Sequence, residues 1–290
     1  MERITLTTEP TKDYELLDSG RGEKLERYGG VVLTRPDPQA LWEKGLPEEE
    51  WQKALGRYVR GGREGEWLTN GGTLPKEWGI EFDTLNFLIR PTSFKHTGLF
   101  PEQLSNWEWM RGVIKSNASS SVLNLFAYTG GATLAAAQSG AQVTHVDGSK
   151  TAVAWAKENA ALSGLGEAPI RWIVEDVLVF VKREIKRGKR YDGIIMDPPA
   201  FGHGPKDELW KIEEDFIELV SLCRELLSDQ PLFFLMSGYA AGYSSLAFAY
   251  NLEPLQKQFG GLVTFGDLAI EESKKKRLLP CGIFARWQNS

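Results

Sequence analysis

The sequence predicts an α/β protein with a doubly wound, mostly parallel sheet and a small N-terminal β-containing domain. Two observations support this prediction. In the C-terminal two-thirds of the chain, short β-branched or apolar runs alternate with longer amphipathic stretches, which is typical of βαβ units. The first ninety residues instead contain short extended pieces broken by Pro36, Pro38 and Pro47. We therefore expect a small β-rich domain over residues 1–90 and an α/β domain over residues 91–290.

Few elements are expected in the N-terminal domain. Extended pieces at 3–7 and 30–34 predict two strands, and the apolar alternation at 81–90, closed by Pro91, predicts another. A helix is expected over 48–56, because its acidic start suits the positive end of the helix dipole.

The C-terminal domain shows a regular succession of elements. Buried strands are expected at 122–126, 143–147, 170–174, 191–197 and 232–236. Helices are expected at 132–139, 150–163, 177–186, 215–228 and 250–259. The runs 263–268 and 281–287 predict two final strands, the last pair of which could be antiparallel. Pro198 and Pro199 end the fourth strand abruptly, since proline has no N–H to donate to a sheet.

Composition excludes several classes of protein. No apolar run approaches the roughly 20 residues of a membrane span, and the first residues lack the order of a signal peptide. The two cysteines form no CxxC pair or metal motif, so we expect a soluble, cytoplasmic protein without a metal site. The sequence sets no expectation for the oligomeric state.

Charge gives a mixed indication about nucleic acid. The net charge of −5 disfavours a protein that coats nucleic acid. Two basic clusters nevertheless stand out, at 182–190 and 274–277. Each is interpreted either as a solvated surface or as an RNA contact.

The loops that follow the strands of the expected sheet are the candidate binding site, because ligands of such sheets bind at the carboxyl ends of strands. The first loop, 124–131, contains paired glycines that permit a tight turn and a close approach of the backbone to a ligand. Its alternative role is a plain connection between strand and helix.

Three acidic residues end successive strands. Asp147 is placed to accept hydrogen bonds from the two hydroxyls of a ribose, or to cap the following helix. Asp176 could bind the exocyclic amine of an adenine while Val177 packs on the ring, or it could cap a helix. Asp197, followed by Pro198 and Pro199, suits hydrogen bonding to a planar amine, with Phe201 stacking on a base for about 1–3 kcal/mol. The alternative is a rigid loop terminator.

These motifs resemble those of class I S-adenosylmethionine-dependent methyltransferases, which have a Rossmann-like fold. Within that class, the run Asn-Leu-Phe-Ala-Tyr-Thr-Gly at 124–130 is similar to the LNxFxYTG motif of the large-subunit ribosomal RNA methyltransferase group. The segment 95–103 looks like the TGxFxDQR stretch of that group, with Pro-Glu-Gln in place of Asp-Gln-Arg. The resemblance covers roughly residues 90–287.

The resemblance implies S-adenosylmethionine as cofactor and an RNA substrate. It places the first loop on the methionine portion, Asp147 on the ribose, Asp176 on the adenine and the motif of the fourth strand on the methyl acceptor. The residues expected to bind the cofactor are Thr97, Gly98, Phe100, Asn124, Phe126, Ala127, Tyr128, Thr129, Gly130, Gly131, Asp147, Ser149, Asp176, Val177 and Asp197. Those expected at the reacting centre are Asp197, Pro198, Pro199 and Phe201.

Differences between this sequence and the motifs of the family disfavour one of the family's reaction mechanisms. Relatives that methylate C5 of cytosine use a cysteine nucleophile, but Cys223 and Cys281 fall in apolar elements away from the candidate loops. We therefore expect Asp197 to orient an acceptor nitrogen, with Phe201 or Tyr239 supporting a base. A nicotinamide-dependent oxidoreductase is disfavoured because the first loop lacks the Gly-x-Gly-x-x-Gly pattern. A small-molecule or protein acceptor, and a non-catalytic RNA-binding module, stay open.

Overall fold

The computed structural model describes residues 1–61, 65–117, 119–239 and 242–289. This described part of the chain forms two compact units, each built from segments that are separated in sequence. The first unit comprises Met1–Leu6, Ser105–Leu268 and Gly282–Ser290, and the second comprises Thr7–Leu104 and Ala269–Cys281. Each unit thus takes in residues from both sides of position 90, where the sequence suggests a domain boundary.

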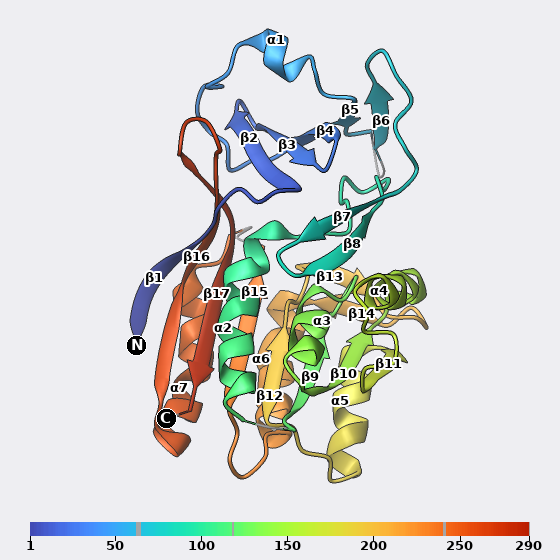
Figure 1. Ribbon diagram of the computed structural model, residues 1–290. Coiled ribbons are helices and arrows are strands. Elements are labelled where there is room, and N and C mark those ends of the chain that lie inside the picture. Colours follow the sequence, from blue (N-terminus) through green and yellow to red (C-terminus); the bar gives the residue numbers. More distant parts are fainter. Residues whose placement is uncertain (62–64, 118, 240–241, 290) are drawn as a thin grey trace. The chain divides into compact units, whose positions relative to one another are not determined.

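A large sheet forms the centre of the first unit (Figure 1), with strand order β1-β16-β17-β15-β12-β9-β10-β11. Its strands are β1 (Glu2–Thr8), β9 (Ser121–Leu125), β10 (Gln142–Asp147), β11 (Ile170–Val174), β12 (Gly193–Met196), β15 (Phe233–Gly238), β16 (Leu262–Glu271) and β17 (Leu278–Gln288). The strands from β15 to β11 are parallel, whereas β17 is antiparallel to β15. The predicted doubly wound, mostly parallel sheet is therefore confirmed.

The order of the strands reverses between β9 and β12. From β9 the chain moves outward to β10 and β11, and it then returns to build β12 and β15 on the other side of β9. Every residue of β12 is buried, as expected for a strand covered on both faces. Pro198 and Pro199 follow it immediately, so the chain leaves the sheet at this point.

Helices cover both faces of this sheet (Figure 1). They are α2 (Leu104–Lys115), α3 (Gly131–Gln138), α4 (Lys150–Leu162), α5 (Val177–Lys186), α6 (Ile212–Glu225) and α7 (Ser245–Phe259). In α5 the buried residues Val177, Phe180, Val181 and Glu184 recur at helical spacing and so form one face. The three apolar residues of that face pack into the main hydrophobic core, whereas Lys182 and Lys186 are exposed.

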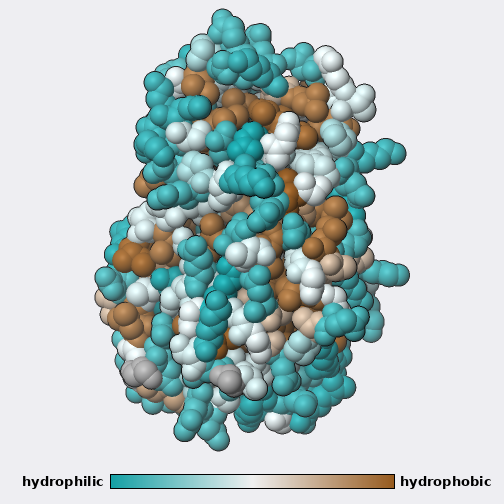
Figure 2. All heavy atoms as spheres, viewed as in Figure 1, coloured by the Kyte–Doolittle hydropathy of each residue, from teal (hydrophilic) through white to brown (hydrophobic). Residues whose placement is uncertain are grey.

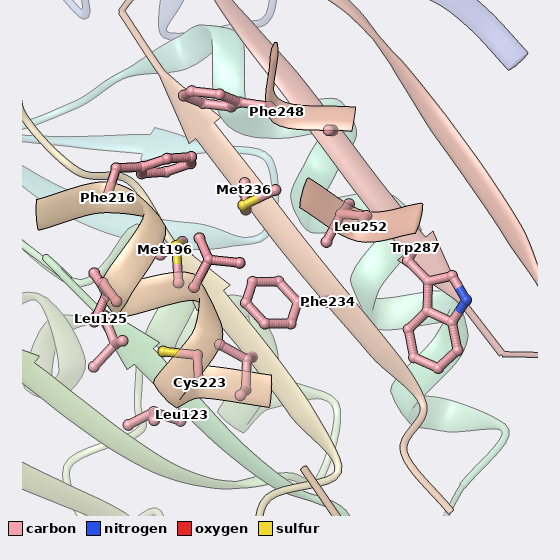
Figure 3. Close-up of a cluster of buried hydrophobic side chains, with 14 of the residues drawn as sticks. Leu123, Leu125, Met196, Phe216, Cys223, Phe234, Met236, Phe248, Leu252 and Trp287 are labelled. Carbon is pink, nitrogen blue, oxygen red and sulfur yellow. The ribbon is translucent and has the colours of Figure 1, made fainter. Parts of the chain in front are cut away.

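Figure 3 shows part of the core, between the large sheet and helices α6 and α7. Leu123 and Leu125, two residues apart in β9, point to the same face of the sheet as Met196 of β12. Phe216 of α6 and Phe248 of α7 stack against each other above this face, with ring centroids 5.1 Å apart. This packing fixes β9 and β12 side by side, and with them the loops that follow these strands.

The second unit is built around a smaller sheet, in the order β2-β3-β4-β5-β6. Its elements are β2 (Tyr14–Gly20), β3 (Glu23–Tyr28), β4 (Val31–Pro36), α1 (Glu48–Trp51), β5 (Gly56–Val59), β6 (Glu66–Thr69), β7 (Trp78–Phe82), β8 (Leu85–Ile89) and the 3₁₀ turn Pro101–Gln103. Glu26 is fully buried and accepts hydrogen bonds from Arg35, Tyr14 and Tyr28. These partners offset the cost of burying the carboxylate.

The structure corrects several details of the predicted elements. The helix expected at 48–56 ends at Trp51, because the N–H of Leu55 pairs with Val32 and draws the chain into β5. The strand expected at 81–90 is a hairpin of β7 and β8, whose turn contains Asp83 with φ 56°. The first strand joins the large sheet, and a hairpin of β13 (Phe201–His203) and β14 (Leu209–Lys211) was not expected.

The surface is mostly hydrophilic on the face that Figure 2 shows, where hydrophobic residues emerge in separate patches. Among the described residues, no helix has the length and apolar character needed to cross a membrane.

Candidate functional site

The candidate site lies at the carboxyl ends of β9, β10 and β12, next to the switch in strand order. Leu125 pairs with both Val146 and Met196, so the loops after these three strands start at the same level of the sheet. Phe126, Asp147 and Asp197 are the first residues beyond those pairs. Ligands of doubly wound sheets bind in this type of crevice.

The loop after β9 is held in an unusual backbone conformation. Phe126 and Tyr128 have φ values of 54° and 48°, in the left-handed region that side chains with a Cβ rarely adopt. Each such residue costs about 1–3 kcal/mol, and such strain gathers at ligand sites. Neighbouring groups hold the loop: Ala127 donates to the carbonyl of Val146, and the amide of the buried Asn159 donates to the carbonyl of Thr129 at 2.9 Å.

The glycines of this loop allow helix α3 to start close to its neighbours. Gly130 has φ 90°, and a Cβ there would lie 3.0 Å from the Cβ of Ala156 in α4. A Cβ on Gly131 would lie only 2.3 Å from the ring of Trp107 in α2. The paired glycines are therefore required by close packing within the first unit.

Asp147 organises the backbone around it. Its Oδ2 accepts the N–H of Tyr128 and its Oδ1 accepts the N–H of Ser149, each at 2.8 Å. Burial raises the pKa of Asp147, while the two backbone hydrogen bonds act in the opposite direction. A carboxylate offers about four lone-pair positions, so each oxygen can still accept one further hydrogen bond. These two remaining acceptor positions fit the two hydroxyl donors of a ribose.

Behind the loop lies a buried polar chain. Asn124 of β9 donates to Oγ1 of Thr133 in α3, and Thr133 is 2.9 Å from Nδ1 of His145 in β10. Burial lowers the pKa of His145 to about 3, so the imidazole is neutral. The chain joins β9, α3 and β10, and the side chain of Asn124 is thus directed into the unit.

Asp197 lies partly buried at the end of β12, beside Ser237 at the end of β15. The hydroxyl of Ser237 hydrogen-bonds to its carboxyl group. Burial raises the pKa of Asp197 to about 6, and the Ser237 hydroxyl opposes this rise. Asp197 therefore titrates near neutrality.

The unexpected hairpin of β13 and β14 follows the Asp197-Pro198-Pro199 motif. Phe201 and His203 are exposed on one of its faces, with their rings 5.1 Å apart. Trp210 on the other face is buried, and its indole N–H donates to the carbonyl of Pro199 at 2.7 Å. The ring of Trp210 also lies 4.9 Å from that of Phe126, so it touches both loops of the switch point.

The turn of the hairpin lies close to the loops that follow Asp147 and contain Asp176. A Cβ on Gly204 would lie 3.1 Å from the Cβ of Asp176, and a Cβ on Gly148 would lie 3.4 Å from Gly204. The loops after β10, β11 and β12 therefore gather around one place. Sequence reasoning missed this hairpin and Trp210, although the alternation Phe-Gly-His and the isolated apolar Leu209-Trp210 pair were available as signals.

Several predicted residues also have structural partners. Asp176 and Ser149 are N-caps, accepting the N–H of Val179 at 2.9 Å and of Ala152 at 3.2 Å respectively. Val177 is buried in the main core. Thr97, Gly98 and Phe100 belong to the second unit, where Thr97 accepts a backbone hydrogen bond from Arg90.

Half of the basic residues in each of the two basic clusters form ion pairs. Lys182 lies 2.7 Å from Glu218, and Arg183 and Arg187 pair with Glu175 and Glu184. In the other cluster, Arg277 pairs with Asp18 and Glu272, and Lys276 pairs with Glu271. These contacts favour the interpretation of both clusters as solvated surfaces.

The structure gives little support for a catalytic cysteine, a catalytic His96 or a metal ion at this site. Cys223 and Cys281 are buried free thiols, and burial raises the pKa of each. His96 is in the second unit, and burial lowers its pKa to about 4. Within the described ranges, no cluster of three His, Cys, Asp or Glu side chains is arranged to hold a metal ion.

Comparison with known proteins accords with this geometry. Residues 34–232 match the sequence model of the S-adenosylmethionine-dependent methyltransferases, a span of more than half the chain. The chain belongs to this family. Its cofactor is therefore S-adenosylmethionine, and the strained loop and the free lone pairs of Asp147 fit that molecule.

Individual relatives agree with this family. A SAM-dependent methyltransferase from Agrobacterium tumefaciens has a TM-score of 0.95 and 38% identity, over 100% of this chain and 95% of that one. The ribosomal RNA large subunit methyltransferase K/L of Shewanella frigidimarina is 34% identical over 70% of this chain and 27% of that protein. The ribosomal RNA large subunit methyltransferase K of Neisseria meningitidis is 31% identical over 72% and 61% respectively. This methyltransferase thus matches less than two-thirds of either curated relative.

Proposed function

We propose that this methyltransferase transfers a methyl group from S-adenosylmethionine to a nitrogen of a ribosomal RNA base. The observation that carries the proposal is the meeting, at one switch point, of the strained Phe126–Gly131 loop, Asp147 and Asp197. The names of the Shewanella and Neisseria relatives support RNA as the substrate. The two buried, free thiols accord with a location in the reducing cytoplasm.

The loops after β9, β10 and β11 would hold the cofactor. Asp147 accepts the ribose hydroxyls on the lone pairs that the backbone leaves unused. The backbone of the 126–131 loop borders the methionine portion, and Asp176 binds the adenine amine through lone pairs not used in capping α5. When bound, the cofactor supplies an electrophilic methyl group on a sulfonium.

The acceptor would be held by the motif after β12. Direct displacement needs the acceptor lone pair in line with the methyl carbon, so alignment is the main task of the enzyme. Asp197 and the carbonyl of Pro198 accept hydrogen bonds from the acceptor amine, and Phe201, which is 56% exposed, stacks on the base. Tyr239, also exposed, lies beyond the end of β15 and can support the base from that side.

A cysteine-dependent C5 mechanism is disfavoured by the same geometry. Cys223 lies within α6 and is fully buried, and the raised pKa keeps its thiol protonated. The thiolate is the nucleophilic form, so this residue cannot add to a pyrimidine ring. The end of β15 and the residue after it read Ser237-Gly238-Tyr239 and contain no cysteine.

Calorimetric titration with S-adenosylmethionine, S-adenosylhomocysteine and NADH tests the cofactor site. We expect micromolar binding of the two adenosyl ligands, and Kd about 100-fold higher in Asp147→Ala, since hydrogen bonds to a charged group contribute about 1.5–3 kcal/mol each. Asn159→Ala is the matched control, because it weakens the same loop through Thr129 and keeps the carboxylate. Equal losses in both variants would contradict the ribose contact.

Methyl transfer is then measured with tritiated cofactor and unmodified large-subunit ribosomal RNA transcribed in vitro. We expect label in the RNA and its loss in Asp197→Ala. Cofactor binding without labelled RNA would refute the RNA substrate and direct the search to protein or small-molecule acceptors. Absence of cofactor binding would leave only a non-catalytic module on this fold.

A further inference from the structure

The side chain of Trp210 joins two parts of the site that the large sheet alone leaves separate. It projects from the inner face of the hairpin, opposite Gly202, and is only 4% exposed. Its ring lies 4.9 Å from Phe126 in the cofactor loop, and its N–H donates to the carbonyl of Pro199 in the acceptor motif. One rigid side chain therefore contacts both loops.

The hydrogen bond to Pro199 constrains the acceptor motif. Neither proline has an N–H, so the backbone of this segment has few groups with which to anchor itself. The indole N–H holds one end of the motif at 2.7 Å, and the N–H of Ile212 holds the carbonyl of Ala200 at 3.1 Å. The carbonyl of Pro199 is engaged by Trp210, and we therefore assign the hydrogen bond from a substrate amine to the carbonyl of Pro198.

We propose that Trp210 is a positioning residue that sets the acceptor motif relative to the cofactor loop through its ring contact with Phe126 and its hydrogen bond to Pro199. The inference rests on the proposed methyl transfer. Trp210 touches neither reactant, so its effect passes through the two loops. Because in-line displacement is sensitive to small displacements of the acceptor, the effect should appear in kcat.

Trp210→Phe separates the two contacts, because phenylalanine keeps a ring near Phe126 and lacks the N–H. Trp287→Phe is the matched control: Trp287 is also buried, and its indole donates to the carbonyl of Gly260 at 2.8 Å, away from the site. Both variants lose one indole hydrogen bond, so a purely structural role predicts similar losses of thermal stability in both.

We expect kcat on the ribosomal RNA transcript to fall about tenfold in Trp210→Phe, with the Kd of S-adenosylmethionine within about twofold of wild type. Trp287→Phe should retain the wild-type kcat. Equal kcat values in Trp210→Phe and Trp287→Phe would overturn the proposal. So would a loss of activity in Trp210→Phe that is fully explained by weaker binding of S-adenosylmethionine.

Hydrogen exchange gives a second readout that needs no acceptor. With cofactor bound, peptides covering residues 200–212 should exchange at least about fivefold faster in Trp210→Phe than in wild type or Trp287→Phe. If the wild type fails to methylate RNA but this difference is present, the proposed substrate is wrong and the positioning role stands. Unchanged exchange in Trp210→Phe refutes the positioning role, whatever the activity.

Discussion

The carboxyl group of Asp197 should make the protein less stable as the pH rises from about 4 to about 6. Burial raises its pKa from 3.8 to about 6, so the folded state binds the proton more tightly than the unfolded chain. The stabilisation is complete below the unfolded pKa and is lost as the pH passes through the folded value. The shift corresponds to about 3 kcal/mol, since one pKa unit is equivalent to 1.36 kcal/mol.

Urea denaturation of wild type and Asp197→Asn between pH 4 and pH 8 measures this effect. Asparagine does not titrate, so the free energy of unfolding of the wild type should fall relative to the variant by about 2.4 kcal/mol between pH 4 and pH 8, the rest of the change lying below pH 4. Asp229→Asn, which removes an exposed carboxylate, is the control for loss of charge. A constant difference between wild type and Asp197→Asn across this range would refute the reasoning.

Substitution of Ser237 gives a further test of the pKa of Asp197. The hydroxyl of Ser237 lowers the pKa of Asp197, so Ser237→Ala should raise that pKa further. The loss of stability would then extend to higher pH. A window that stays in place, or moves to lower pH, would show that the Ser237 hydroxyl does not stabilise the carboxylate.

Three further outcomes are expected. Gly131→Ala should lower the free energy of unfolding by about 1–3 kcal/mol, because its Cβ would lie 2.3 Å from the buried ring of Trp107, and an unchanged Tm would contradict this packing. The wild type should lose stability as the pH falls from 6.5 towards 3, because burial lowers the pKa of His145 and the side chain binds a proton only in the unfolded chain. His145→Gln should lose less stability over this range. If the free energies of unfolding of wild type and variant fall equally, the imidazole is not held neutral in the folded protein. Replacing Cys223 and Cys281 together by alanine should leave labelled methyl transfer intact, and loss of transfer by the folded double variant would point to a cysteine nucleophile.

The fold class could be predicted, and candidate site residues could be named, because their signals are local. Buried parallel strands leave continuous apolar runs such as Gly-Ile-Ile-Met, and amphipathic helices such as α5 repeat their apolar residues at helical spacing. Helix α5 was predicted at its observed bounds, Val177–Lys186. Asp147, Asp176 and Asp197 could be singled out because each lies at the end of a strand or within two residues of it.

Short-range patterns failed where long-range pairing decided the conformation. The acidic start at Glu48 suits a helix, yet pairing of Leu55 with Val32 ends it within one turn. The first strand, predicted in the N-terminal domain, hydrogen-bonds in the large sheet because its partner β16 lies more than 250 residues later. Such pairings leave no mark in the local sequence.

The sequence by itself determined which residues follow the strands, because this depends only on order along the chain, and its resemblance to class I methyltransferases indicated the cofactor. Only the tertiary structure decided how those residues are shared between ligand and protein. In the folded chain, Asn124 donates a hydrogen bond to Thr133, and Asp147 accepts two backbone N–H groups. Trp210 contacts both Phe126 and Pro199. The physical reason is that packing and hydrogen bonding join residues far apart in sequence, and only the folded chain fixes which of them meet.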